Sequence, residues 1–514
     1  MDKSRVKTLR DLVMVSAECY GDNIYLKEKA GKEISEKSFN DFYNDVRRVS
    51  GYIAAVTEGT VHAAVIGPTS YAYLAAFFGT VSGGNVIVPL DAQLPCPDLC
   101  DHLQRADVTV FFYDSKYKPM LDAIKAECPE IKHYICLQAD EENMSVEKIM
   151  AECEIAEELP EISSDTLASI VYTSGTTGKS KGVMLTHGNY VDNAMCRDGE
   201  AEAGDSLLSV LPIHHIYCFT CDILLSLRYG ATVCVNDSMM RIAMNLKLFQ
   251  PSVMLLVPMI AETILKQIKA ACAAKPEIPP QMIAQAVFGG KLKGIYSGGA
   301  YLAPEIMEEY KKLGIPMAQG YGMTECSPRI SSSLLTEENY GDVGVIVNGC
   351  QVKIEDGEIV VKSPSVMQGY YKNPEATAEV LTEDGWLHTG DLGYVDRNRV
   401  FITGRKKNLI ILSNGENVSP EELENKFAGK DIIGDVLVYA EEGVITAEIY
   451  PNADYCKDMD KAAVAQALND LIKEINTTVT SAKTIRRIRL RDVEFDKTTS
   501  KKIRRQQPLK GEII

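Results

Sequence analysis

Residues 172–182 read Tyr-Thr-Ser-Gly-Thr-Thr-Gly-Lys-Ser-Lys-Gly, and they follow a short apolar run at residues 168–172. An apolar run of this length is typical of a buried strand. Glycine lets the backbone after such a strand approach a ligand closely, and successive N–H groups in a loop form a concave anion site. Because hydroxyl groups and the charges of Lys179 and Lys181 accompany them, we expect this loop to hold a polyphosphate.

A P-loop and a flexible surface turn are the two alternatives for this segment. The triplet 178–180, Gly-Lys-Ser, matches the end of the P-loop NTPase motif, but that motif needs another glycine five positions before Gly178, where this chain has Thr173. Residues 183–185 continue as an extended apolar run, whereas a P-loop leads into a helix. A flexible surface turn without a ligand leaves the two lysines unexplained.

The first 300 residues alternate short apolar runs with helical patterns. We expect strands at residues 62–66, 85–89, 108–113, 133–137, 168–172, 231–235, 253–257 and 294–297, and helices that include 38–54 and 116–128. Alternation of strands and helices predicts an α/β fold whose sheets are largely parallel.

The pattern changes near residue 352. Residues 352–362 alternate around Asp356-Gly357, and residues 436–450 do so around Glu442-Gly443, which predicts two β-hairpins. Residues 460–478 then have helical spacing. We therefore expect a large N-terminal region over residues 1–404, with parallel-rich sheets and a β-subdomain, and a small α+β domain over residues 405–514.

Composition excludes several classes of protein. The 514 residues are 46% hydrophobic and 24% charged, as in globular proteins, and the net charge of −17 argues against general nucleic-acid binding. The 14 cysteines form no repeating framework, so we expect them to be structural and reduced. We see no secretory signal and no run of 18 apolar residues, which predicts a cytoplasmic protein without an integral membrane segment.

Five further motifs lie downstream of the loop: residues 298–302 (Gly-Gly-Ala-Tyr-Leu), 320–325 (Gly-Tyr-Gly-Met-Thr-Glu), 386–391 (Trp-Leu-His-Thr-Gly-Asp), 404–408 (Gly-Arg-Lys-Lys-Asn) and 497–505 (Lys-Thr-Thr-Ser-Lys-Lys-Ile-Arg-Arg). With the loop, this ordered set resembles the adenylate-forming superfamily of acyl-CoA synthetases, aryl-CoA ligases, peptide-synthetase adenylation domains and luciferases. The resemblance spans about residues 30–510. It implies that ATP and a carboxylic acid form an acyl-adenylate and pyrophosphate, and that a thiol then takes the acyl group and releases AMP.

The resemblance implies a nucleotide site. The implied ATP- and AMP-binding residues are Thr173, Ser174, Gly175, Thr176, Thr177, Gly178, Lys179, Lys181, Gly299, Ala300, Tyr301, Tyr321, Gly322, Met323, Thr324, Asp391, Arg405 and Lys502. Tyr321 would lie against adenine, Thr324 on the α-phosphate, and Asp391 with Arg405 on the ribose hydroxyls.

The resemblance also implies catalytic and metal-binding roles. Glu325 and Thr176 would hold Mg²⁺, a hard cation that suits a carboxylate combined with phosphate and water. Thr324, Glu325, His215 and Lys502 would act in catalysis. Lys501 stands where many relatives have glycine, and the Ile-x-Arg that follows favours Lys502 as the catalytic lysine.

The small domain is expected to be a mobile lid. Lys407 takes the position of the hinge in the family, and Ser413, Gly415 and Glu416 belong to the loop that the family presents to coenzyme A. The resemblance implies that the domain turns about Lys407 between the two half-reactions.

Residues 211–217, Leu-Pro-Ile-His-His-Ile-Tyr, face the acid substrate in relatives. Amino-acid-activating relatives have a Phe-Asp pair here, whereas this chain has no acidic residue before Asp222. The double histidine resembles synthetases of the long-chain acyl-CoA type, with an acyl pocket at His215, Tyr217 and Gly298. Core-packed, hydrogen-bonded histidines are the alternative.

The leading hypothesis is an AMP-forming acyl-CoA ligase that uses ATP, Mg²⁺ and coenzyme A on a fatty or similarly apolar acid. One alternative loads an acyl or aryl acid onto the phosphopantetheine of an acyl carrier protein. An alternative of another class is a non-catalytic nucleotide-binding protein with the same fold.

Overall fold

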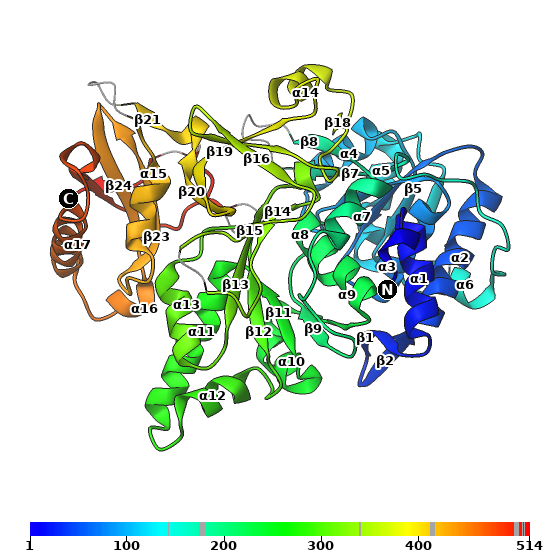
Figure 1. The fold of residues 1–514 in the computed structure, drawn as a ribbon, viewed down its shortest axis with the longest axis horizontal. Coiled ribbons are helices and arrows are strands. Elements are labelled where there is room, and N and C mark those ends of the chain that lie inside the picture. The colour runs from blue at the N-terminus through cyan, green and yellow to red at the C-terminus, as the bar shows by residue number, and fades with distance from the viewer. Residues whose placement is uncertain are drawn as a thin grey trace.

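The computed structural model describes residues 1–141, 143–173, 180–338, 341–411, 417–497, 503–505, 507 and 509–514. Two large sheets with their helices occupy the chain up to β20, and a four-stranded sheet forms a separate unit at the other end (Figure 1). This arrangement confirms the expected α/β class with parallel-rich sheets and a separate C-terminal α+β domain. The division at residues 404 and 405 stays a prediction.

The seven-stranded sheet contains the strands that flank the glycine-rich loop. Its order is β18 (Gly369–Tyr370), β8 (Lys181–Thr186), β7 (Leu167–Thr173), β4 (Val86–Leu90), β3 (His62–Ile66), β5 (Val108–Tyr113) and β6 (His133–Cys136). The five strands from β7 to β6 are parallel, whereas β7 and β8 are antiparallel, with Thr173 opposite Lys181. The loop therefore joins two neighbouring strands, as the extended run at residues 183–185 indicated, and does not lead into a helix.

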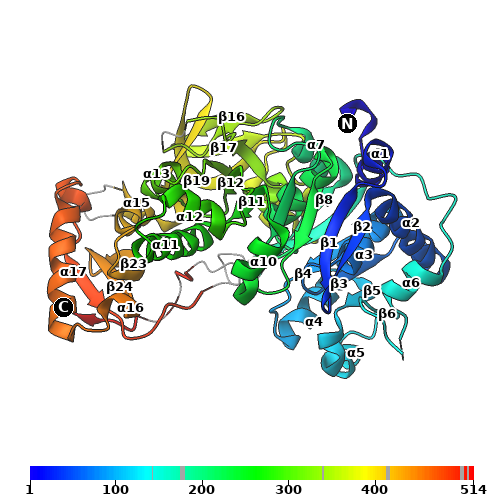
Figure 2. The same cartoon turned by 90° about the horizontal axis from the view of Figure 1, so that it is seen from below.

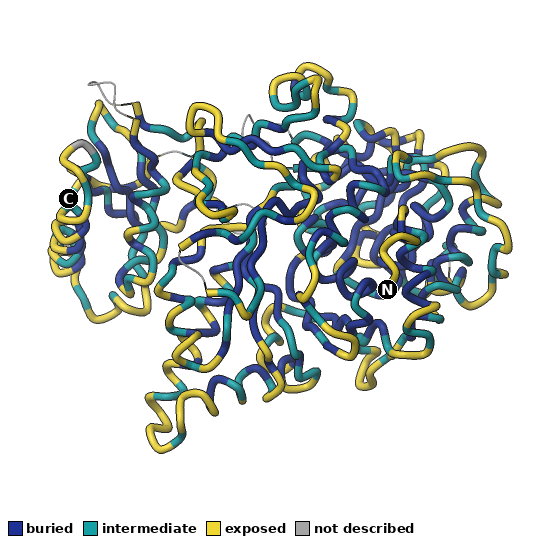
Figure 3. The backbone as a smooth tube through the Cα atoms, in the orientation of Figure 1, coloured by how far each residue is buried: buried dark blue, intermediate teal, exposed yellow. Residues whose placement is uncertain are grey.

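Helices α3 (Tyr71–Ser82) and α4 (Cys96–Arg105) contact strands of this sheet. Around them, α2 (Phe39–Val56) and α6 (Val146–Glu152) pack against α3, and α5 (Leu121–Glu127) packs against α4. Every residue of α3 is buried. Its Phe77 ring lies 4.2 Å from the ring of Phe219, which belongs to the acid-side segment, so one core continues from the first sheet into the second. Figure 3 shows this buried interior beneath an exposed outer surface.

The thirteen-stranded sheet is parallel in one half and antiparallel in the other. Its order is β16 (Gln351–Glu355), β17 (Glu358–Lys362), β19 (Leu387–Asp396), β20 (Arg399–Arg405), β15 (Val345–Ile346), β14 (Arg329–Ser332), β13 (Met317–Gly322), β12 (Gly294–Ser297), β11 (Val253–Leu256), β9 (Ser206–Ser209), β10 (Thr232–Val235), β1 (Ile24–Ala30) and β2 (Glu33–Ser38). The neighbouring strands β1, β10, β9, β11, β12 and β13 are parallel. The expected β-subdomain consists of the antiparallel strands β14, β15, β20, β19, β17 and β16.

The predicted hairpin at residues 352–362 is β16 and β17 of this sheet. Asp356 and Gly357 form its turn with φ values of 48° and 80°, the left-handed backbone that a tight hairpin turn requires.

The remaining helices of the large N-terminal region are α1 (Leu9–Tyr20), α7 (His187–Met195), α9 (Leu225–Tyr229), α10 (Ile242–Phe249), α11 (Pro258–Ala274), α12 (Pro280–Val287), α13 (Pro304–Lys312) and α14 (Pro374–Val380).

The C-terminal unit has its own core. It contains β23 (Ile433–Glu441), β24 (Val444–Pro451), β25 (Arg487–Leu490) and β26 (Glu512–Ile513), with α15 (Pro420–Glu424), α16 (Ala453–Cys456) and α17 (Lys461–Asn476). Arg491 and Glu448 form a fully buried ion pair of 2.9 Å inside it. Figure 2 shows α17 and the helices α4 and α5 at opposite ends of the molecule.

Two whole-chain features accompany this fold. All fourteen cysteines are free. Within the described part of the chain, no helix combines the length and the apolar composition needed to cross a membrane.

The first helix is tied to α7 through a buried imidazole, and this contact predicts a pH dependence of stability. The backbone N–H of Leu9 donates a 3.1 Å hydrogen bond to Nδ1 of His187, and burial lowers the pKa of His187 to about 4. The unfolded chain binds this proton near pH 6.5 and the folded chain does not, so stability falls as the pH drops from 6.5 towards 4.

Lowering the pH from 7 to 5 should reduce the free energy of unfolding of both proteins. The reduction should be about 2 kcal/mol larger for the wild type than for His187→Gln, which lacks the titrating imidazole. Urea unfolding of both proteins at both pH values measures the difference. Equal losses in the two proteins would contradict a buried, neutral His187.

Candidate active site

A cavity of about 750 Å³ has walls from both large sheets. Predicted site residues in this wall are Thr173, His215, Tyr217, Gly299, Ala300, Tyr321, Gly322, Met323 and Thr324. The structure thus brings together four sequence motifs: the start of the glycine-rich loop, the double-histidine segment, residues 298–302 and the residues around Tyr321.

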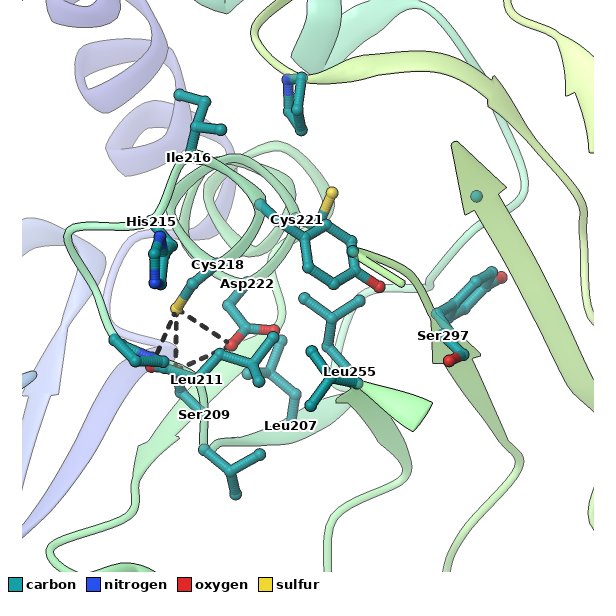
Figure 4. A pocket seen from close by; sticks show the side chains of 18 of the residues that line it. Leu207, Ser209, Leu211, His215, Ile216, Cys218, Cys221, Asp222, Leu255 and Ser297 are labelled. Atoms are coloured by element: carbon teal, nitrogen blue, oxygen red, sulfur yellow. Dashed lines mark hydrogen bonds between the residues drawn. The ribbon is translucent and has the colours of Figure 1, made fainter. Parts of the chain in front are cut away.

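One end of the cavity is mainly apolar (Figure 4). Its wall includes Leu207, Leu211, Ile216 and Leu255. Gly298 lies directly behind this wall, since a Cβ added there would come within 2.8 Å of the Tyr217 ring. The absence of a side chain at Gly298 therefore makes room for the ring of Tyr217, and the two residues predicted for the acyl pocket are neighbours.

The two adjacent histidines have different surroundings. Their rings are 4.3 Å apart, and His214 Nε2 lies 3.8 Å from a carboxylate oxygen of Asp91. Burial, with His215 adding to it, lowers the pKa of His214 to about 3, so this imidazole is neutral at physiological pH. His215, by contrast, lines the cavity.

Asp391 forms a second, polar cluster behind the cavity wall. The Tyr321 hydroxyl donates a 2.8 Å hydrogen bond to Oδ2 of Asp391, and Arg405 Nε lies 2.7 Å from Oδ1. Asp391 on β19 stands opposite Arg405 on β20, so the strand register sets this ion pair. Burial and the Asp391 charge raise the pKa of Tyr321 well above its ordinary value, which keeps the phenol as a hydrogen-bond donor.

Glu325 is held by a residue that the sequence did not single out. It lies in the short helix η5 (Thr324–Cys326), and its Oε1 accepts a 2.8 Å hydrogen bond from the Tyr370 hydroxyl. Lys181 Nζ stands 4.7 Å from the centre of the same Tyr370 ring. Tyr370 is on β18, which pairs with β8, so it links the strand after the glycine-rich loop to Glu325.

The start of the C-terminal unit is rich in basic residues. Arg405 pairs with Asp391, and Lys406 Nζ lies 2.8 Å from a carboxylate oxygen of Glu358. Partial burial of the Lys407 ammonium group and the nearby Arg405 charge lower the pKa of Lys407. Glu358 also accepts a hydrogen bond from the backbone N–H of Gly390, the residue before Asp391, so it helps to fix the strand that positions Asp391.

Asp222 is the first acidic residue after the double histidine, and it lines the cavity although the sequence did not single it out. The helical segment α8 (Ile216–Cys218) continues as the π-helix η3 (Phe219–Leu224), which puts Cys218 and Asp222 on one face. Their side chains contact each other, with Cys218 Sγ 3.6 Å from Asp222 Oδ2. A helical continuation of residues 216–224 would have been the signal for this placement.

Several expected residues are not in the cavity wall. Tyr301 is half exposed and does not line it. Asp391 and Arg405 lie behind Tyr321, which does line it, whereas Lys181 and Glu325 contact Tyr370, which does not. The predicted residues that lie outside the described part of the chain are Ser174, Gly175, Thr176, Thr177, Gly178, Lys179, Ser413, Gly415, Glu416 and Lys502. Among the described residues, no three His, Cys, Asp or Glu side chains gather into a metal site.

Comparison with curated proteins finds ligases. A long-chain-fatty-acid–[acyl-carrier-protein] ligase of Arabidopsis thaliana, AEE15, is 30% identical over 60% of this chain and 54% of its own. A 4-coumarate–CoA ligase of Pinus taeda is 32% identical over 72% and 66% of the two chains, and the long-chain-fatty-acid–CoA ligase FadD15 of Mycobacterium bovis is 25% identical over 89% and 86%. The matched stretch spans little more than half the length of the first relatives found.

Solved structures share the fold over nearly the whole chain. The O-succinylbenzoate coenzyme A synthetase MenE of Bacillus subtilis, in complex with AMP, has a TM-score of 0.77 and 25% identity over 98% of this chain and 99% of its own. ATP-bound MatB of Rhodopseudomonas palustris has a TM-score of 0.81 and 23% identity over 96% and 97%. The latter likeness is one of fold.

Family models agree with the motifs. Residues 14–371 match the AMP-binding enzyme family, and residues 407–511 match the AMP-binding enzyme C-terminal domain. The first match alone covers more than half of the chain, and the resemblance inferred from the ordered motifs is confirmed. The chain belongs to the AMP-binding enzyme family.

Proposed function

We propose that the protein is an AMP-forming acid–thiol ligase, which activates a carboxylic acid with ATP and transfers the acyl group to coenzyme A. The observation that carries this proposal is the single cavity shared by the segment around Tyr321 and Thr324 and by the apolar wall near His215 and Tyr217. A nucleotide at the first and an acid at the second would meet within it.

In the first step, a carboxylate oxygen attacks the α-phosphorus of ATP, and the bond from that phosphorus to the bridging oxygen of pyrophosphate breaks. Two anions must approach each other, so catalysis consists mainly of positioning and of stabilising spread negative charge. Thr324 would hold the α-phosphate, the N–H groups of residues 174–179 the departing phosphates, and Lys502 the charge that develops. Tyr321 and Arg405 fix Asp391 so that its oxygens can accept the ribose hydroxyls.

Glu325 fits the role of a ligand to the Mg²⁺ ion that accompanies a bound nucleotide. Mg²⁺ binds through one or two carboxylates, with phosphate and water oxygens in the other positions, and it would neutralise phosphate charge. The buried carboxylate of Glu325, oriented by the Tyr370 hydroxyl, supplies one such ligand. Thr176 is the second ligand proposed.

In the second step, a thiolate attacks the acyl carbon and AMP leaves with the bonding electron pair. The proposal assigns Lys407 as the hinge of the C-terminal unit and Ser413, Gly415 and Glu416 as residues on the coenzyme A side. The names of relatives include both CoA ligases and an acyl-carrier-protein ligase, so a carrier-protein phosphopantetheine is the alternative thiol.

For the acid, we propose a fatty or similarly apolar molecule, because Leu207, Leu211, Ile216 and Leu255 line that end of the cavity. An aryl acid is the alternative, and one relative is named as a 4-coumarate–CoA ligase. The cytoplasmic location expected from the sequence stays a prediction.

Acid-dependent exchange of labelled pyrophosphate into ATP tests the first step across a panel of aliphatic and aromatic acids. The acids that support exchange are then incubated with ATP and either coenzyme A or acyl carrier protein, and release of AMP with thioester formation identifies the thiol. If none of the acids in the panel supports exchange, the result would favour a non-catalytic nucleotide-binding protein.

Replacing Glu325 tests the magnesium proposal. Glu325→Gln should lower adenylation about 100-fold and raise the Mg²⁺ concentration needed for half-maximal rate, because it loses the charge that holds the cation. Glu379→Gln is the matched control, since Glu379 is exposed and lies near Tyr370. An unchanged Mg²⁺ titration and rate in Glu325→Gln would refute the role.

Lys502 should act in the first step alone. Lys502→Ala is expected to lose adenylation by about 100-fold or more, while it converts a supplied acyl-adenylate to thioester at close to the wild-type rate. Lys501→Ala, the neighbouring control, should keep both rates. If Lys502→Ala loses both half-reactions equally, or if Lys501→Ala shows the selective loss, the assignment is wrong.

A further inference from the structure

Asp222 is a buried carboxyl group in the wall of the acid-side cavity. Asp222 is 1% exposed, and Figure 4 shows its side chain between the labelled lining residues Ser209 and Leu255. Oδ2 accepts a 2.8 Å hydrogen bond from the Ser209 hydroxyl and contacts Cys218 Sγ at 3.6 Å. Oδ1 has no hydrogen-bond partner among the residues that the structure describes.

Three other oxygens in the same cavity wall share this property. Glu200 Oε2, Ser226 Oγ and Ser297 Oγ are buried and have no hydrogen-bond partner within the described part of the chain. A buried polar group without a partner costs about 1–3 kcal/mol, and folded proteins pair nearly all such groups. Four of them belong to residues that line one cavity, so a ligand that enters it would find several polar groups without a partner among the described residues.

The charge state of Asp222 also suits a ligand. Burial raises the pKa of Asp222 to about 7, while Ser209 and Cys218 lower it. Arg329, an arginine of the cavity wall, is already paired with Glu200 at 2.5 Å. Near neutral pH the Asp222 carboxyl can therefore accept a hydrogen bond, and an N–H or O–H group of a ligand would stabilise its ionised form.

We infer that the acid substrate carries a hydrogen-bond donor, a hydroxyl or an amine, away from its carboxylate, and that Asp222 Oδ1 accepts this hydrogen bond. The inference rests on the proposed function and narrows its substrate class from an apolar acid to an acid with an apolar body and a polar far end. Asp222 is then a specificity-determining residue.

The helix that contains Asp222 gives the scale of the substrate. His215 precedes α8, and Asp222 lies seven residues further on, in the π-helix η3, so the two wall residues are separated by at most roughly 10 Å along the helix axis. A purely aliphatic chain of that length would leave Asp222 Oδ1 unpaired, whereas a terminal donor would reach it. A site that hydrogen-bonds a substrate group rejects the analogue without that group.

Matched pairs of acids test this inference through pyrophosphate exchange. The pairs are hexanoate with 6-hydroxyhexanoate and 6-aminohexanoate, octanoate with 8-hydroxyoctanoate, and cinnamate with 4-hydroxycinnamate. For at least one pair, the wild type should use the donor-bearing acid with a kcat/KM at least 10-fold higher than that of the plain acid. Asp222→Leu should abolish or reverse this ratio.

Two further variants keep the test decisive. Asp222→Asn retains the size of the side chain and loses its charge, so the preference for the amine should fall at least threefold even if Asp222→Leu does not fold. Asp192→Asn is the control, because Asp192 is a partly buried carboxylate bonded to Ser365 and does not line the cavity. Its ratios should match the wild type.

The outcomes separate this inference from the proposed function. Exchange that favours the plain acid in every pair, or wild-type ratios in both Asp222 variants, would overturn the inference and leave the ligase proposal intact. If no acid of any kind supports exchange, the ligase proposal is overturned, and this inference with it.

Discussion

The buried carboxylate of Asp391 is the contact on which the arrangement of the site depends. It accepts a hydrogen bond from Tyr321 on β13 and pairs with Arg405 at the end of β20, where the chain leaves the large sheet. Asp391 is buried while Arg405 is partly exposed, so the cost of losing these partners falls on the Asp391 carboxylate, which would be left buried without full compensation. One side chain therefore positions both the cavity wall at Tyr321 and the start of the C-terminal unit.

A second contact joins the two large sheets. Tyr370 belongs to the seven-stranded sheet, and its hydroxyl holds Glu325, which follows β13 of the thirteen-stranded sheet. Lys181 lies over the same ring. Together with Arg405, these contacts place basic and hydrogen-bonding groups close behind Tyr321 and Thr324, which line the cavity, in a chain whose net charge is −17. This local concentration is what a single polyphosphate needs, and the overall charge does not supply it.

Local patterns predicted the elements of this fold well. Strands β3, β5 and β12 have the expected bounds, and the turn at Asp356-Gly357 follows from two residues that tolerate positive φ. Contacts between distant segments were not predictable in the same way. Tyr370 meets Glu325 across 45 residues, and β1 pairs with β10, about 200 residues away, because tertiary packing decides both. The place of Asp222 in the cavity wall was not predicted, because it depends on a helical continuation that a mixed apolar stretch does not reveal.

The central claim is that a carboxylate oxygen attacks the α-phosphorus of ATP. The most direct measurement uses an acid that supports pyrophosphate exchange, labelled with ¹⁸O in both carboxylate oxygens, in a complete reaction with ATP, Mg²⁺ and coenzyme A. Mass spectrometry then locates the label. The account predicts one ¹⁸O atom in each AMP released and none in pyrophosphate. Unlabelled AMP, with ¹⁸O in pyrophosphate or orthophosphate, would contradict attack at the α-phosphorus.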